Sequence, residues 1–218
     1  LDAGAEIVIT GRVADAARWG NALPPAPGLK RGRGIACGIY KAASYAAVVA
    51  DVEVDGTTGV VKVNQMWCAH DCGRVINPDQ VRAQCEGNLV WGIGTVLVER
   101  LPVAASAVAA STFADSPIPR FADVPALSVL IVDEGEAPSG AGETAIVAAG
   151  AAIANALRDA CGLRLQQLPL READVRGALA RRTSPSGGHH DRLRQRRNGP
   201  RARSGHARAG FAAAAASG

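Results

Sequence analysis

A pair of valine-rich runs joined by an Asp-Gly turn constrains the fold of this chain more than any other feature. Ser44–Asp55 alternates in polarity and is rich in valine, which favours a half-buried β-strand. The turn that follows is Asp55-Gly56-Thr57-Thr58-Gly59, and Val60–Met66 then returns as a second strand-forming run. An Asp-Gly step between two such runs is a strong local signal for a hairpin. The sequence therefore predicts an antiparallel β-hairpin over this stretch.

Two predicted helices follow the hairpin. Asn77 and Pro78 open the first, Asp79–Glu99, because Asn is a favoured N-cap and Pro is tolerated in the first turn. The second runs from about Thr144 to Ala160 and ends at a left-handed cap on Gly162. Further strands are predicted at Leu127–Val132, with both faces buried, and at Arg164–Leu168. Strands and helices mixed with hairpin connections predict an α+β fold, a mixed β-sheet with packed helices.

Both ends of the chain differ from this central region. Residues 1–27 form a poorly matched N-terminal segment with one short strand-like run, Glu6–Thr10. Asn21–Gly34 contains three prolines and three glycines, which is typical of a linker. Residues 171–218 carry 11 arginines against three acidic residues, so their balance of +8 outweighs the −4 of the remainder. Because this segment is rich in Gly, Pro, Ser and Ala and has no interleaved aromatic residues, we expect a disordered tail and no nucleic-acid binding.

The five cysteines show no disulfide framework, and their odd number favours a reduced intracellular setting. Cys68, His70 and Cys72 form a Cys-x-His-x-Cys cluster that resembles part of a zinc site, but four ligands are usual and no second cluster exists. No apolar run has the length of a membrane span, and no signal pattern opens the chain. We therefore expect no metal ligands and a cytoplasmic location, with the periplasm as the alternative.

One glycine-bearing loop carries the clearest candidate for chemistry. Ser139-Gly140-Ala141-Gly142-Glu143 precedes the alanine-rich second helix. The glycines allow a tight turn and close approach to a ligand, and a helix start offers backbone N–H groups to an anion. A carboxylate in the first helical turn is, however, commonly a surface residue that favours the helix dipole. Spacing alone leaves both interpretations open.

Longer stretches on both sides resemble one enzyme family. Val48–Glu99, with its Asp71-Cys72-Gly73-Arg74 loop, and Ser111–Leu170 resemble the C-terminal part of the molybdopterin-binding large subunit of the xanthine dehydrogenase/aldehyde oxidase family. The likeness is to the isoquinoline 1-oxidoreductase and nicotinate dehydrogenase type. The resemblance runs from about residue 28 to residue 170, so it predicts a C-terminal molybdopterin-binding domain at residues 28–170.

The resemblance implies roles for individual residues. Glu143 would be the catalytic base that removes a proton from the hydroxyl group carried by the pterin-bound molybdenum, during oxidative hydroxylation of an N-heterocycle or an aldehyde. Gln84 would place its amide against the cofactor. The further cofactor-binding residues are glycines that admit or contact the pterin: Gly73, Gly87, Gly140 and Gly142.

The resemblance also implies companions for this chain. The cofactor would be molybdopterin, in its cytosine dinucleotide form, and iron–sulfur clusters would lie on a small 2Fe-2S subunit. A flavin or cytochrome subunit and the remainder of the large subunit are the other expected partners. Because such subunits are several times longer, the isolated chain is expected to be inactive. The alternatives are a truncated remnant that folds in part without cofactor, and a binding module that uses the basic tail.

Overall fold

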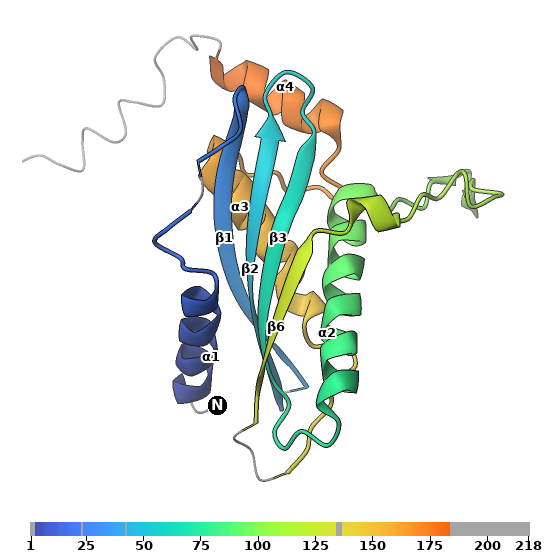
Figure 1. Ribbon diagram of the computed structural model, residues 1–218. Helices are drawn as coiled ribbons and strands as arrows, with labels where there is room; N and C mark the ends of the chain where they lie inside the picture. The colour runs from blue at the N-terminus through green and yellow to red at the C-terminus, as the bar shows by residue number, and fades with distance from the viewer. Residues whose placement is uncertain (1–2, 23, 42, 134–136, 184–218) are drawn as a thin grey trace, which may run out of the picture. The chain divides into compact units, whose positions relative to one another are not determined.

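The computed structural model describes residues 3–22, 24–41, 43–133 and 137–183, and these build a four-stranded sheet with helices on both faces (Figure 1). The strand order is β1-β2-β3-β6, with antiparallel pairing except between β3 and β6, which run parallel. The strands are β1 (Leu29–Tyr40), β2 (Ser44–Asp55), β3 (Val61–Asp71) and β6 (Ala126–Val132). The predicted α+β class is confirmed.

The predicted hairpin is formed by β2 and β3. One Asp55 side-chain oxygen accepts hydrogen bonds from the backbone N–H groups of Thr57 and Thr58, at 2.7 and 3.2 Å. These bonds stabilise the carboxylate, so the pKa of Asp55 lies below its usual value. The Asp-Gly turn thus closes as the sequence indicated, and the second strand extends five residues beyond the predicted Met66, to Asp71.

The predicted linker at Asn21–Gly34 is wrong for its second half, because β1 begins at Leu29. Gly32 and Gly34 lie directly beneath α3 (Ile146–Cys161), where an added Cβ would collide with the helix backbone near Ala156 and Ala152. These glycines therefore permit a close strand–helix contact instead of flexibility.

Two helices cover the same face of the sheet. The first predicted helix is found as α2 (Pro78–Ile93), followed by a π-helical turn η1 (Gly94–Val98). The Asn77 side chain caps it by accepting from the Gln80 N–H at 3.1 Å. The second is α3, which ends at Gly162 with φ of 68°, the left-handed cap that was predicted. Their buried side chains form the main core with the inner face of the strands.

The opposite face carries α1 (Ala3–Ala16), where a short strand was predicted. Ile9, Val13 and Ala17 recur every four residues and are buried against Ala47, Val49, Trp67 and Ala69. That spacing places them on one helical stripe. The prediction failed because Glu6–Thr10 was interpreted without the apolar positions that follow it.

Two further segments depart from the predictions. Arg164–Leu168 forms no strand; Leu163 and Leu170 are buried in the main core, and the Leu170 N–H donates to the Val96 carbonyl in η1. The predicted disordered tail begins with a helix, α4 (Glu172–Thr183), whose Val175, Ala178 and Leu179 pack into the same core. The rest of that tail, residues 184–218, lies outside the described residues.

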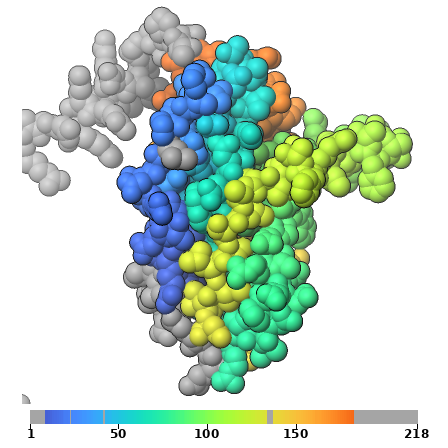
Figure 2. Space-filling model, viewed as in Figure 1, coloured from blue at the N-terminus to red at the C-terminus, as the bar shows by residue number. Residues whose placement is uncertain are grey.

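An arm between η1 and β6 extends away from the sheet (Figures 1 and 2). It contains the short strands β4 (Val103–Ala104) and β5 (Ala107–Val108) and the 3-10 turn η2 (Phe121–Asp123). Phe113 is 92% exposed and Phe121 is 95% exposed. The arm therefore contributes little to the core. None of the helices in the described ranges has the length and apolar character needed to cross a bilayer.

Candidate functional site

The Ser139–Glu143 loop lies at one end of the sheet, where the β1–β2 turn, the end of β3 and the start of α2 come together. Its entry is fixed by backbone pairing. The Ser139 N–H donates to the Cys72 carbonyl at 2.7 Å, and Gly73 bridges to Pro138. The predicted Asp71–Arg74 loop and the predicted Glu143 loop are therefore neighbours in the fold.

Buried polar side chains hold two carbonyls of this loop from behind. The Ser44 hydroxyl donates to the Gly140 carbonyl at 2.5 Å and lies 3.0 Å from the Ser139 hydroxyl. Asn88 donates through Nδ2 to the Gly142 carbonyl at 2.8 Å. Ser44 is 1% exposed and Asn88 is 6% exposed, so water competes little with either bond.

This bracing determines the direction of two backbone amides. The N–H and C=O of one trans peptide point in opposite directions. Since the carbonyls of Gly140 and Gly142 point at buried donors, the N–H groups of Ala141 and Glu143 point away from them. The N–H groups of Gly140 and Gly142, which the sequence suggested as donors, belong to the preceding peptides, so their role stays a prediction.

Asn88, a residue of α2, also caps the start of α3. Its Oδ1 accepts from the Ile146 N–H at 3.2 Å, while its Nδ2 also donates to the Gln84 carbonyl at 2.6 Å. The next two amides, of Val147 and Ala148, donate to backbone carbonyls. The expectation of bare amides at this helix start is therefore wrong for these three groups. Glu143 precedes the first helical residue instead of occupying the first turn.

Glu143 itself is exposed and has one side-chain partner in the described part of the chain. The Tyr40 hydroxyl donates to its Oε2 at 2.9 Å, across 103 positions of sequence. The hydrogen bond to the carboxylate, together with its negative charge, raises the pKa of Tyr40. A tyrosine hydroxyl is protonated at neutral pH even without this shift, so the phenol acts as the donor.

Gln84 lies on the exposed side of α2, next to the loop. Its Nε2 is 3.4 Å from the Gly142 carbonyl, a long contact for a hydrogen bond. Gly87 and Trp91 follow at helical spacing on the exposed side, and Trp91 is 48% exposed. No atom lies within 4 Å of a Cβ added at Gly87 or Gly140. The predicted contact residues therefore border open surface.

Gly73 has a different setting. Its φ is 70°, and an added Cβ would collide with the Ala137 carbonyl. The residue thus allows β3 to turn and pair with the entry to the Glu143 loop. A direct contact with a pterin remains a prediction for this glycine.

The Cys-x-His-x-Cys cluster has other partners. The Cys68 thiol is buried and interacts with the Cys85 thiol of α2, and this hydrogen bond, together with burial, raises the pKa of Cys68. His70 is buried with Nδ1 3.1 Å from the Tyr45 carbonyl. Among the described residues, no group of three or more His, Cys, Asp and Glu side chains could hold a metal ion.

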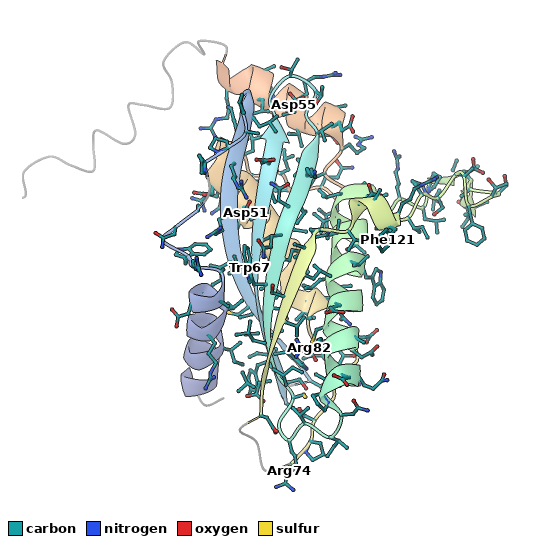
Figure 3. The ribbon with its side chains drawn as sticks, viewed as in Figure 1. Asp51, Asp55, Trp67, Arg74, Arg82 and Phe121 are labelled. Atoms are coloured by element: carbon teal, nitrogen blue, oxygen red, sulfur yellow. The ribbon has the colours of Figure 1, made fainter. Side chains whose placement is uncertain are left out.

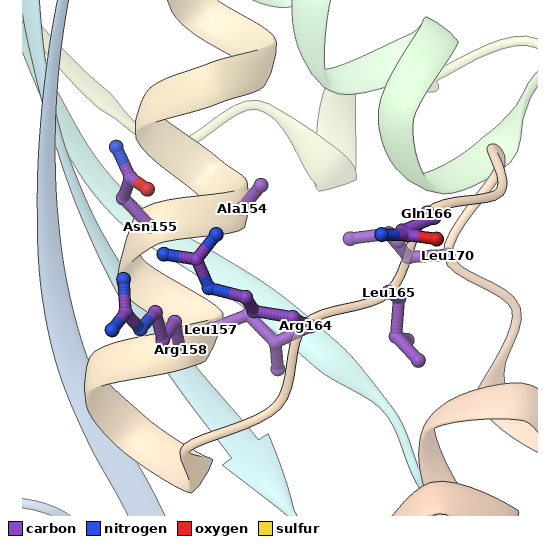
Figure 4. A pocket seen from close by; sticks show the side chains of 8 residues that line it. All are labelled: Ala154, Asn155, Leu157, Arg158, Arg164, Leu165, Gln166 and Leu170. Carbon is purple, nitrogen blue, oxygen red and sulfur yellow. The ribbon is translucent and has the colours of Figure 1, made fainter.

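A small cavity of about 150 Å³ lies elsewhere, between α3 and the segment that precedes α4 (Figure 4). Leu157 and Arg158 of α3 and Arg164 beyond it contribute to its wall. Because Arg158 lies 12 residues along α3 from Ile146, the helical rise separates this cavity from the loop by roughly 18 Å. It does not belong to the candidate site.

Sequence reasoning missed Tyr40, Ser44 and Asn88. Asn88 carried a signal, because it stands four residues after Gln84 and beside the buried Leu89, where a polar residue must find partners. Tyr40 and Ser44 end β1 and begin β2, and only the strand pairing brings both to the loop.

The exposed groups suit a polar, flat ligand. The Gln84 amide and the Glu143 carboxylate provide donors and acceptors, the Ala141 and Glu143 N–H groups point away from the buried donors, and Gly87 and Gly140 leave room for close approach. A pterin edge presents both donors and acceptors. The residues present therefore fit such a cofactor on one side.

The chain is similar to known molybdopterin-binding proteins. Residues 36–125 match the model of the molybdopterin cofactor-binding domain. A nicotinate dehydrogenase subunit from Pseudomonas putida is 41% identical over 157 residues, 68% of this chain and 13% of the relative. The beta subunit of isoquinoline 1-oxidoreductase from Brevundimonas diminuta is 35% identical over 130 residues, 60% of this chain and 17% of the relative. The chain thus spans less than a fifth of either relative's length.

Solved structures agree in fold. Quinoline 2-oxidoreductase from Pseudomonas putida 86 superposes with a TM-score of 0.59 and 25% identity, over 63% of this chain and 19% of that one. Aldehyde oxidoreductase from Desulfovibrio gigas gives a TM-score of 0.57 and 30% identity, over 63% of this chain and 15% of that one. The family match, the relatives and the shared fold together identify residues 36–125 as a molybdopterin cofactor-binding domain, and the matched part of the chain is similar to the molybdopterin-binding large subunits of the xanthine dehydrogenase/aldehyde oxidase family.

Proposed function

We propose that this chain forms one wall of the cofactor site in a molybdenum hydroxylase and that Glu143 is the general base of the reaction. The observation that carries the proposal is an exposed carboxylate on a loop whose carbonyls are fixed by Ser44 and Asn88. A braced loop keeps the base in a defined position, and a positioned general base contributes about 10²–10⁴ in rate.

Each wall residue has a task in this proposal. Gln84 offers an uncharged amide to the cofactor edge, and Gly87, Gly140 and Gly142 let the ligand approach the backbone. The N–H groups of Ala141 and Glu143 donate to acceptors on the ligand. Gly73 holds the neighbouring loop in place. Bound there, molybdenum with its pterin would supply the oxygen-transfer and redox chemistry.

The relatives' names support a proposal for the substrate class. Their names refer to nicotinate, isoquinoline, quinoline and an aldehyde. We propose an N-heterocycle or an aldehyde as substrate and molybdopterin cytosine dinucleotide as the cofactor form. The partners in this proposal are the remainder of the large subunit, a 2Fe-2S subunit, and a flavin or cytochrome subunit. The relatives' names as subunits support an assembly in general.

Purification of the chain together with its natural partners tests this function. Molybdenum and pterin present in near-equal amounts, and lost together from a Gln84→Ala variant, would support the cofactor wall. A folded chain that carries neither group in the assembly would overturn it and favour the inactive remnant. Salt-sensitive DNA binding that is lost when residues 184–218 are deleted would instead favour the binding module that uses the basic tail.

A further inference from the structure

We propose that Tyr40 is a positioning residue that holds the Glu143 carboxylate in the orientation it needs to accept a proton. This inference rests on the proposed role of Glu143 as the base. It starts from the hydrogen bond between the Tyr40 hydroxyl and Glu143 Oε2, at 2.9 Å. With Oε2 engaged, Oε1 is the oxygen available to a ligand.

The backbone beneath Tyr40 is fixed relative to the loop. Tyr40 is the last residue of β1 and is paired with Ser44, the residue that holds the Gly140 carbonyl. Two residues earlier, Gly38 lies against the Val147 side chain at the start of α3. The phenol and the loop are thus attached to the same hairpin end and helix start, so the separation between Tyr40 and Glu143 is set by packing.

The chemistry of the pair fits positioning. An exposed glutamate samples several rotamers, and a hydrogen bond from a half-buried phenol restricts them. A phenol donates without adding positive charge, so it orients the carboxylate more than it neutralises it. Lys41 lies over the Tyr40 ring, with Nζ 5.3 Å from the centroid, which further limits the ring.

Titration of the phenol in the full chain tests the contact without cofactor. Tyr40 and Tyr45 are the two tyrosines of the sequence, so a Tyr45→Phe background isolates the Tyr40 signal in ultraviolet absorbance. We expect the pKa of Tyr40 to fall when Glu143→Ala is added, because the acceptor and its negative charge are removed. An unchanged midpoint in a chain with unchanged circular dichroism would overturn the contact and the proposal.

Kinetics of the assembled, cofactor-loaded enzyme test the consequence. We expect Tyr40→Phe, which keeps the ring and loses only the hydroxyl, to lower kcat on the order of tenfold while KM stays within about twofold. Tyr45→Phe is the matched control, because that ring packs beside the α1 core, and we expect it to retain full activity.

The outcomes separate the two proposals. Full kcat in Tyr40→Phe together with an inactive Glu143→Gln would overturn the positioning role and leave the base intact. Full kcat in Glu143→Gln would overturn both. A Tyr40→Phe variant that loses activity through a raised KM alone would make Tyr40 a substrate-binding residue and contradict the proposal.

Discussion

Two polar clusters of this domain differ in what their side chains are directed toward. On the α1 side, Arg31 and Arg33 pair with Asp51 at 2.6 and 3.0 Å, and Asp51 is 1% exposed. Arg33 also donates to the carbonyls of Ala17 and Arg18 and lies 5.2 Å from the Trp67 ring centroid. Asp51 and Trp67 lie on adjacent strands (Figure 3). We call these residues the charged cluster; its bonds are directed inward.

The loop cluster, formed by Tyr40, Ser44, Asn88 and Glu143, is arranged the other way. Neutral buried groups fix the backbone, and the one ionised side chain is exposed. A buried charge network is suited to attaching an element, here α1, to the sheet. A neutral frame with an exposed carboxylate is suited to presenting that carboxylate to a ligand.

Breaking the charged cluster should have the largest effect on stability. Asp51→Ala leaves Arg33 buried without a counter-charge, and such losses cost about 3–5 kcal/mol. Urea unfolding of the full chain measures the change. Asp174→Ala is the control, because its pair with Arg171 is 47% and 41% exposed and should contribute little to stability. Equal losses in the two variants would contradict the distinction between the clusters.

Breaking the loop cluster should cost less stability and act locally. Asn88→Ala leaves the Gly142 carbonyl and the Ile146 N–H without their partner, at about 1–3 kcal/mol. Hydrogen exchange should become faster at Ile146, while α1 stays protected. Asn155→Ala removes one exposed bond to Ile35 and serves as the control. Unchanged exchange at Ile146 would show that Asn88 does not brace the loop.

The smallest expected effect is a pH dependence of stability. It arises from His70, a buried residue that belongs to neither cluster. His70 is buried, Nε2 has no hydrogen-bond partner in the described part of the chain, and burial lowers its pKa below 6.5. Below that pH the unfolded chain binds a proton that the native state does not, so stability falls as pH falls. Urea unfolding at neutral and mildly acidic pH should show this loss, and His70→Phe should reduce it. An equal pH dependence in the variant would contradict the assignment.

The sequence predicted elements whose signals are local. The Asp55 turn, the Asn77 cap and the Gly162 cap each depend on a few adjacent residues, and all three are confirmed. The strand at Leu29–Tyr40 was missed because Gly32 and Gly34 imply flexibility until α3 is placed over them. Helix α1 was missed because its apolar stripe is buried only by contact with the sheet, and the sequence does not show that contact.

The residues of the candidate site also divide into those that the sequence identified and those that depend on distant contacts. Glu143 and Gln84 were identified from the family resemblance, whereas Tyr40, Ser44 and Asn88 act across 54 to 103 positions of sequence. No local pattern connects such distant residues. Their contacts arise from strand pairing and helix packing, which a single sequence does not display.

The central claim concerns the proton accepted by Glu143, and turnover of the Glu143→Gln variant tests it most directly. The assembled enzyme should keep its molybdenum and pterin and lose about 10²–10⁴ in kcat, because glutamine retains the shape and lacks the basic oxygen. Glu86→Gln, a half-buried carboxylate on the neighbouring helix α2, should stay within a few-fold of the parent. Turnover of Glu143→Gln within a few-fold of the parent, with the cofactor bound, would contradict the account.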